Sequence, residues 1–182
     1  MFNPDAPPRK KRSLRAEPSE VYGFITDDGV PLRLTRYRGG RKGPVLLSHG
    51  LDISSSIFSL DTIDMNLVEF LYAPRYDVWL LDYRFSIALP TSELLASGDT
   101  VAQYDYPAAV SKVRTVTGVS AIQIIAHCVG SITLFMSLLA SLQGVQSSVS
   151  SQVAAHYVVP TLTASKAELH LPEVLQTLGS IP

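Results

Sequence analysis

The fold is decided by Ala121-Ile122-Gln123-Ile124-Ile125-Ala126, which is followed at once by His127-Cys128-Val129-Gly130. A short, nearly continuous apolar run is typical of a strand that is buried on both faces, as in a parallel sheet. Ile132 to Leu142 is apolar almost all round and predicts a buried helix, which Gly144 can end. We therefore predict a strand, a sharp turn at Ala126 to Gly130 and a helix in immediate succession.

Other parts of the chain repeat this alternation of strand and helix. Apolar runs at Pro44 to Leu47 and Tyr76 to Leu81 predict two more buried strands, and we expect a sixth strand at Val153 to Val159, ending at Pro160. Two predicted helices lie between these strands. Apolar residues at helical spacing mark the first at Leu67, Phe70 and Leu71. The second has Val110, Val113 and Val116 at spacing three, with Pro107 in its first turn and Gly118 at its end.

The beginning of the ordered chain has a different pattern. Val21 to Thr26 and Pro31 to Tyr37 tend to alternate polar and apolar residues on either side of Asp27-Asp28-Gly29, which predicts an antiparallel hairpin. The later strand–helix–strand order requires right-handed crossovers and helices on both faces of a sheet. The predicted fold class is therefore α/β, with a mostly parallel sheet and an antiparallel hairpin at its start.

Composition limits the function classes. A chain of 182 residues with 46% hydrophobic residues forms one globular domain, and a net charge of −1 gives no overall field that would recruit nucleic acid. One cysteine excludes an intrachain disulfide and fits a reducing compartment. Met1 is followed by no apolar leader, and Ile132 to Leu142 is too short to cross a bilayer, so we expect a cytoplasmic protein.

Residues 1–19 are rich in proline and basic residues, whereas order is expected to begin near Glu20. A charge run of this kind is typical of a solvated, disordered tail or linker. Contact with anionic lipid or with an acidic partner domain is the alternative. We therefore divide the chain into a tail at 1–19 and an α/β domain at 20–182.

The turn at Ala126-His127-Cys128-Val129-Gly130 has the pattern of a nucleophile elbow, with a small residue on each side of the reactive one. Small flanking residues are needed because the turn is tight. The turn places Cys128 at a helix N-terminus, where the helix dipole favours the thiolate. The backbone N–H of Val129 then faces an oxyanion formed after attack. A small buried hydrophobe is the alternative role for Cys128; Ser131, one turn later, is interpreted as a packing residue.

Ser48-His49-Gly50-Leu51 directly follows the predicted strand at Pro44 to Leu47. A second oxyanion donor belongs at this position, and the N–H of Leu51 is the candidate. Gly50 allows the backbone to approach closely. We interpret His49 as structural.

The chain resembles the α/β-hydrolase superfamily, and within it the acid-lipase and related esterase branch. Residues 20–180 are covered by this resemblance, which rests on the elbow and on Ser48-His49-Gly50, Asn66-Leu67-Val68-Glu69-Phe70-Leu71, Tyr76-Asp77-Val78-Trp79-Leu80-Leu81-Asp82-Tyr83-Arg84 and Tyr104-Asp105-Tyr106-Pro107-Ala108-Ala109. The chain is also similar to the hydrolase-like segment associated with bacterial cholesterol-oxidase-type flavoproteins, whose elbow is likewise His-Cys-Val-Gly-Ser.

The resemblance implies hydrolysis of carboxylic esters, or thioesters, of an apolar lipid- or steroid-like substrate, without a cofactor. Cys128 takes the place of the serine found in most lipases. The resemblance also implies a flavoprotein oxidase as partner or fusion, and a non-catalytic lipid-binding or docking module is the alternative function.

Hydrolases of this fold have an acid and then a histidine downstream of the nucleophile. The remaining candidates are His156, which is interpreted as a core histidine in the predicted sixth strand, and His170, Glu168 and Glu173 at the beginning of a cap segment. We assign neither acid nor base and expect a truncated hydrolase whose later strands are missing. Such a sheet would expose an apolar parallel edge and favour self-association.

Other constellations are weak. The sequence has no glycine-rich phosphate loop, and its four histidines lack metal-ligand spacing, so no metal is predicted. Asp105, shortly before Pro107, is expected to cap a helix. Arg84 is expected either to line a pocket or to lie on the surface.

Overall fold

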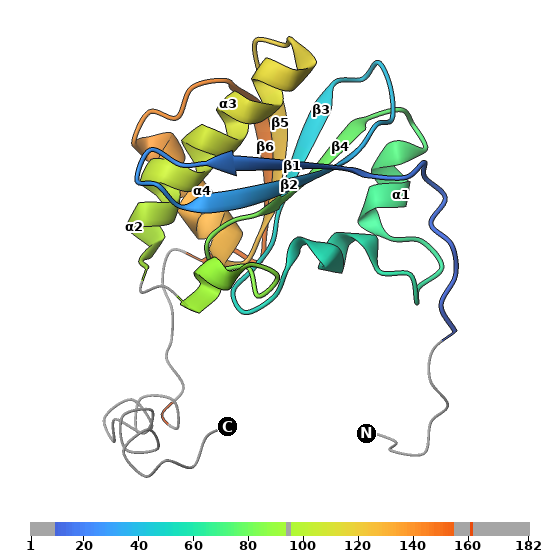
Figure 1. The fold of residues 1–182 in the computed structure, drawn as a ribbon, viewed down its shortest axis with the longest axis horizontal. Helices are drawn as coiled ribbons and strands as arrows, with labels where there is room; N and C mark the ends of the chain where they lie inside the picture. The colour runs from blue at the N-terminus through green and yellow to red at the C-terminus, as the bar shows by residue number, and fades with distance from the viewer. Residues whose placement is uncertain (1–9, 94–95, 155–160, 162–182) are drawn as a thin grey trace.

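The computed structural model describes residues 10–93, 96–154 and 161 (Figure 1). One six-stranded sheet has the order β1-β2-β4-β3-β5-β6. Strand β1 (Glu20–Ile25) pairs antiparallel with β2 (Pro31–Tyr37), and β2 pairs antiparallel with β4 (Asp77–Asp82). Strands β4, β3 (Pro44–Ser48), β5 (Ile122–His127) and β6 (Val145–Ser151) are parallel to one another. The predicted α/β fold with an antiparallel start is confirmed.

Helices connect the parallel strands. The α-helices are α1 (Leu67–Tyr72), the single-turn α2 (Gly98–Thr100), α3 (Tyr106–Thr117) and α4 (Val129–Leu139). The 3-10 helices are η1 (Ser55–Ser59) and η2 (Pro90–Glu93), and the π-helical turn η3 (Val101–Asp105) leads directly into α3. Pro107 lies in the first turn of α3, and Gly118 ends that helix with φ 73°, as predicted.

The sheet separates two hydrophobic cores, with α1 on one face and α3 and α4 on the other (Figure 1). Successive strand residues point to opposite faces. Leu46 of β3 therefore packs in the core beneath α3 and α4, whereas its neighbour Leu47 packs in the core beneath α1. Both are fully buried, which explains why β3 is apolar throughout rather than alternating.

The prediction of the sixth strand was wrong. Strand β6 is Val145–Ser151, within the serine-rich segment, and residues 155–159 of the predicted strand lie outside the described residues. An edge strand needs little apolar surface, because most of its side chains are exposed to water. Among the described residues, β6 forms this edge of the sheet, and its exposed side chains are mostly polar, whereas an apolar edge was expected.

Part of the predicted tail contacts the domain. The Arg12 guanidinium pairs with both carboxylate oxygens of Glu69 in α1 and donates to the carbonyls of Ile63 and Asp64. The Arg15 amide also donates to Glu69. Residues 1–9 lie outside the described residues. None of the described helices combines the length and apolarity that crossing a membrane requires.

Candidate active site

Cys128 occupies the one-residue junction between β5 and α4. Its backbone has φ 54° and ψ −123°, a conformation that costs free energy for any residue with a Cβ atom. The Cys128 amide donates to the Ser151 carbonyl of β6 at 2.9 Å, and its carbonyl accepts the amide of Ser131 at 2.9 Å. These bonds hold the strained residue in place, so the side chain projects at the end of the sheet beside the first turn of α4.

The small residues of the elbow are required by packing. Ala126 is fully buried. A Cβ atom added to Gly130 would lie 2.4 Å from the His49 carbonyl oxygen and 2.9 Å from the Ser48 hydroxyl oxygen, closer than real Cβ atoms approach other atoms. Glycine at position 130 therefore lets the start of α4 pack directly on the end of β3.

The turn after β3 lies against the cysteine. A Cβ atom added to Gly50 would be 3.1 Å from Cys128 Cβ and 3.6 Å from Cys128 Sγ. Gly50 itself is buried, whereas Leu51 is half exposed. The structure thus brings the Ser48-His49-Gly50-Leu51 turn and the elbow to one place at the carboxyl ends of β3 and β5.

Two buried tyrosines that the sequence analysis did not single out tie this region together. The Tyr106 hydroxyl hydrogen bonds with the Gly130 carbonyl at 2.6 Å and with the Ser48 hydroxyl at 2.7 Å. The Tyr83 hydroxyl donates to the carbonyls of His49 at 3.0 Å and Gly50 at 3.3 Å. Burial raises the pKa of both phenols, so both remain protonated donors.

His49 has a structural position, with a fully buried ring that stacks on Tyr83 at a centroid distance of 4.4 Å. Its Nδ1 lies 2.7 Å from the Gly50 carbonyl oxygen, which only accepts, so Nδ1 is the protonated nitrogen. Burial lowers the pKa of His49 and favours the neutral ring. Among the described residues, its Nε2 has no hydrogen-bond partner, and it lies 3.9 Å from Asp82 Oδ1.

The other predicted elbow residues lie around the cysteine. His127 is half-buried, and its Nδ1 is 2.8 Å from the Ser151 hydroxyl of β6. Val129 begins α4 and is half-buried. Ser131 is buried and donates to the Ser151 carbonyl, which agrees with the packing role expected for it.

The expectations for Arg84 and Asp105 were wrong. Asp105 does not cap α3 with its side chain; its buried carboxylate accepts the backbone amide and guanidinium of Arg84. Arg84 is itself buried and also pairs with Asp28 in the β1–β2 turn. A buried carboxylate requires such partners, and here they join the end of β4, the start of α3 and the hairpin. The buried ion pair leaves Arg84 neither in a pocket nor on the surface.

The candidates for a catalytic acid and base, His156, His170, Glu168 and Glu173, lie outside the described residues. Within residues 10–93, 96–154 and 161, no group of three or more histidine, cysteine or acidic residues could hold a metal ion.

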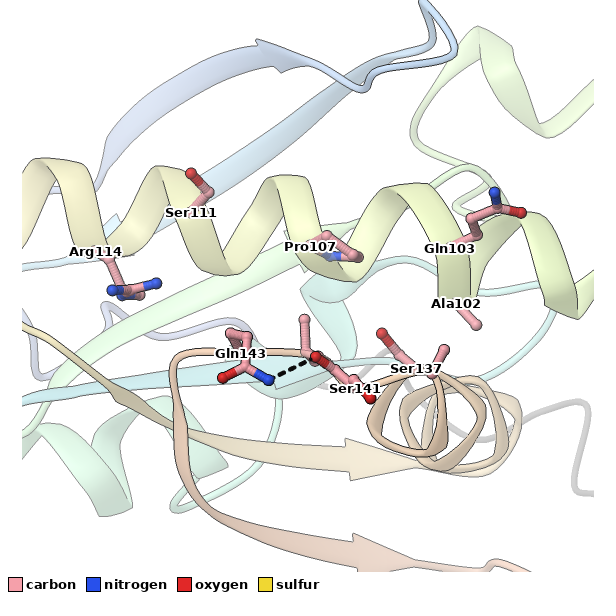
Figure 2. A pocket seen from close by; sticks show the side chains of 10 residues that line it. Ala102, Gln103, Pro107, Ser111, Arg114, Ser137, Ser141 and Gln143 are labelled. Atoms are coloured by element: carbon pink, nitrogen blue, oxygen red, sulfur yellow. Dashed lines mark hydrogen bonds between the residues drawn. The ribbon is translucent and has the colours of Figure 1, made fainter.

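Two clefts flank α4. One of about 360 Å³ lies between α3 and α4, and its wall includes Arg114, Ser137 and Gln143, whose amide donates to the Ser141 carbonyl (Figure 2). It contains no residue of the elbow. The other, of about 750 Å³, is apolar and lined by Ile132, Phe135, Met136, Leu138, Leu139, Val153 and Ala154. Its first residue, Ile132, donates its amide to the Cys128 carbonyl, so this cleft begins one helical turn from the cysteine.

Comparison with solved structures places the fold in a known class. An esterase from Pyrococcus furiosus superposes with a TM-score of 0.59 at 19% identity, covering 78% of this chain and 55% of the esterase. An α/β hydrolase fold protein from Burkholderia ambifaria gives a TM-score of 0.58 at 14% identity, covering 95% and 56%. The protein therefore has the α/β-hydrolase fold.

Sequence comparison finds similarity to lipases. No family model matches. Lipase lipl-1 of Caenorhabditis elegans is 30% identical over 163 residues, which cover 76% of this chain and 40% of the lipase. Lysosomal acid lipase/cholesteryl ester hydrolase of Homo sapiens is 31% identical over 137 residues, covering 66% and 34%. The chain thus spans about two fifths or less of the length of these relatives.

Proposed function

We propose that the protein hydrolyses carboxylic esters, or thioesters, of apolar lipids with Cys128 as the nucleophile. The observation that supports this most strongly is the junction of β5 and α4, where a strained cysteine lies against the Gly50 turn. Strain of this kind is maintained only where surrounding bonds enforce it, and it is common at functional sites.

In the proposed reaction, the Cys128 thiolate attacks the ester carbonyl carbon and forms a tetrahedral oxyanion. The amides of Val129 and Leu51 stabilise the negative oxygen. Collapse of this intermediate breaks the bond to the alkoxy group, which leaves as the alcohol after taking a proton, and an acyl thioester remains on Cys128. Water then hydrolyses the thioester and restores the thiol. A histidine serves as the base in enzymes of this type, and we assign that role to no described residue.

An apolar substrate is supported by two observations. The relatives bear the names lipase and cholesteryl ester hydrolase. The apolar cleft along α4 begins one turn from Cys128, and its Phe135 and Leu139 are exposed. Burial of a hydrocarbon chain there would contribute about 0.8 kcal/mol for each methylene group. We therefore favour long-chain or sterol esters over small, soluble esters.

The resemblance to cholesterol-oxidase-associated segments extends the proposal to a flavoprotein oxidase partner. Such an oxidase would use the alcohol that ester cleavage releases. Co-purification of this chain with a sterol-oxidising flavoprotein tests the association, and separate elution of the two proteins at micromolar concentration would exclude a stable complex.

The function is tested by mixing the full chain with p-nitrophenyl butyrate. We expect a burst of one p-nitrophenolate per chain and a mass increase of one butyryl group on the peptide that contains Cys128. Cys128→Ala removes the nucleophile and should abolish both signals, whereas Ser131→Ala, one turn along the same helix, should retain them. Absence of acylation in the wild-type chain, together with binding of a fluorescent fatty acid, would favour the lipid-binding module instead.

A further inference from the structure

The Gly50 carbonyl accepts two hydrogen bonds from fully buried rings. The Tyr83 hydroxyl shares its single proton between this carbonyl at 3.3 Å and the His49 carbonyl at 3.0 Å, and His49 Nδ1 donates to the Gly50 carbonyl at 2.7 Å. The two rings stack on one another, and neither has any solvent-exposed surface. We call these two residues, with the carbonyl that they hold, the Tyr83–His49 clamp.

The clamp sets the direction of the next amide. The Gly50–Leu51 peptide is trans, so its C=O and N–H groups point in opposite directions. The carbonyl points toward the buried rings. The N–H of Leu51 therefore points away from them. Leu51 itself is exposed, and Gly50 lies against Cys128.

We propose that Tyr83, together with His49, is a positioning residue that holds the Leu51 amide toward the oxyanion formed at Cys128. The proposal rests on the proposed function, because an oxyanion arises only if Cys128 is acylated. In this scheme, Tyr83 acts through the peptide that it holds.

Such positioning matters because an oxyanion donor is effective only when its direction is fixed before reaction. Removing one donor outright typically costs about 10²–10³-fold in rate. Loosening the Leu51 amide while leaving it in place should cost less, about 10- to 100-fold. The Val129 amide would be unaffected, because it belongs to α4 and is held by the elbow.

The test compares two reactions of the same thiol in the full chain. Acylation by p-nitrophenyl butyrate develops an oxyanion, whereas alkylation by iodoacetamide does not. In Tyr83→Phe, we expect the acylation rate constant to fall by about 10- to 100-fold while the alkylation rate constant changes by less than about twofold. The matched control is Tyr37→Phe, a buried tyrosine in the core on the other face of the sheet, which should alter neither rate.

Three results would overturn the proposal, and they can be told apart. Equal acylation by wild type and Tyr83→Phe would exclude a positioning role and leave the proposed function intact. A parallel fall in both rates would show that Tyr83 acts on the thiol or on the whole site. A wild-type thiol that is alkylated but never acylated would refute the proposed function and the role of Tyr83 with it.

A second variant keeps the proposal testable if Tyr83→Phe does not fold. His49→Leu removes the other donor to the Gly50 carbonyl and also removes the unpartnered Nε2. Removing Nε2, a buried nitrogen without a partner among the described residues, offsets part of the cost of losing the Nδ1 hydrogen bond. We expect acylation to slow about 10-fold while alkylation remains unchanged; unchanged acylation in a folded His49→Leu chain would contradict the clamp.

Discussion

Helices α1 and α4 both follow the end of a strand or loop, but they begin in opposite ways. Helix α1 has Asn66 at its N-cap in an extended conformation, with φ −100°. The Asn66 side chain accepts the Glu69 amide while Glu69 accepts the Asn66 amide, which is a complete capping box. Helix α4 has Cys128 at its N-cap with φ 54°, and no side chain caps it.

The two helix ends therefore differ in capping: the end of α1 is fully capped, whereas in the proposed function the end of α4 binds the oxyanion. Each helix has free N–H groups in its first turn, and they must find acceptors. At α1, the side chains of Asn66 and Glu69 supply acceptors. Arg12 donates hydrogen bonds to the Glu69 carboxylate and so helps to fix the cap. At α4, the Val129 amide has no hydrogen-bond acceptor among the described residues, and the neighbouring Cys128 is strained. In the proposed function, this amide binds the oxyanion.

The largest effect on stability is expected from Gly130→Ala, which disrupts the packing between the first turn of α4 and the end of β3. The new methyl group would meet the His49 carbonyl oxygen and the Ser48 hydroxyl, and backbone atoms cannot move aside cheaply. We expect destabilisation of about 3 kcal/mol or more, measured by urea denaturation, and loss of acylation by p-nitrophenyl butyrate. The control is Gly23→Ala on β1, where an added Cβ meets no atom within 4 Å. Normal stability of Gly130→Ala would show that the elbow does not need glycine.

A smaller effect is expected from Glu69→Gln, which weakens the closed helix end. Hydrogen bonds from Arg12 are the largest cause that lowers the pKa of Glu69, to about 2 from an ordinary value of 4.5. A carboxylate with a lowered pKa in the folded state stabilises the protein above pH 4.5, and this stabilisation is lost as the pH falls toward 2. Glu69→Gln should therefore lower the Tm by about 5 °C at pH 7 and by progressively less between pH 4.5 and 2.

As a control, the rate of Cys128 acylation is compared between Glu69→Gln and the wild type. Because α1 and α4 lie on opposite faces of the sheet, the acylation rate of folded Glu69→Gln should equal that of the wild type (Figure 1). A Tm difference that does not diminish at low pH would mean that Glu69 stabilises the fold by packing rather than by its charge.

The contrast between these helix ends also shows how far the sequence could predict the structure. The continuous apolar runs of β3, β4 and β5 revealed buried strands, and the Ala126–Gly130 pattern located the elbow. Strand β6 was placed at the wrong residues because its side chains are mostly exposed and show no apolar pattern. Its pairing with β5 is made by backbone groups, and a side-chain pattern does not indicate such pairing. Contacts between residues distant in sequence were also beyond prediction, such as Arg12 with Glu69.

The same limit applies to the candidate site. The five-residue elbow motif and the Ser48–Leu51 turn are local patterns, and the structure brings them together at the ends of neighbouring strands. Tyr83 and Tyr106 carry no local signal, since a tyrosine among apolar residues is ordinary core. Their function depends on which carbonyls their hydroxyls reach, which is set by tertiary packing.

The smallest effects form a pair with opposite signs, Asn66→Ala at the closed helix end and Cys128→Gly at the open one. Asn66→Ala removes a side-chain cap and should destabilise the protein by about 1 kcal/mol without changing acylation. Cys128→Gly should abolish acylation, because it removes the thiol. It should also relieve the strain of a positive φ, which costs about 1–3 kcal/mol. Because glycine also makes the unfolded chain more flexible, the expected net increase in the free energy of unfolding is about 1 kcal/mol. Urea denaturation of both variants beside wild type measures the pair. If Cys128→Gly were as destabilising as Asn66→Ala, the backbone at position 128 would not be strained, and the two helix ends would differ only in their caps.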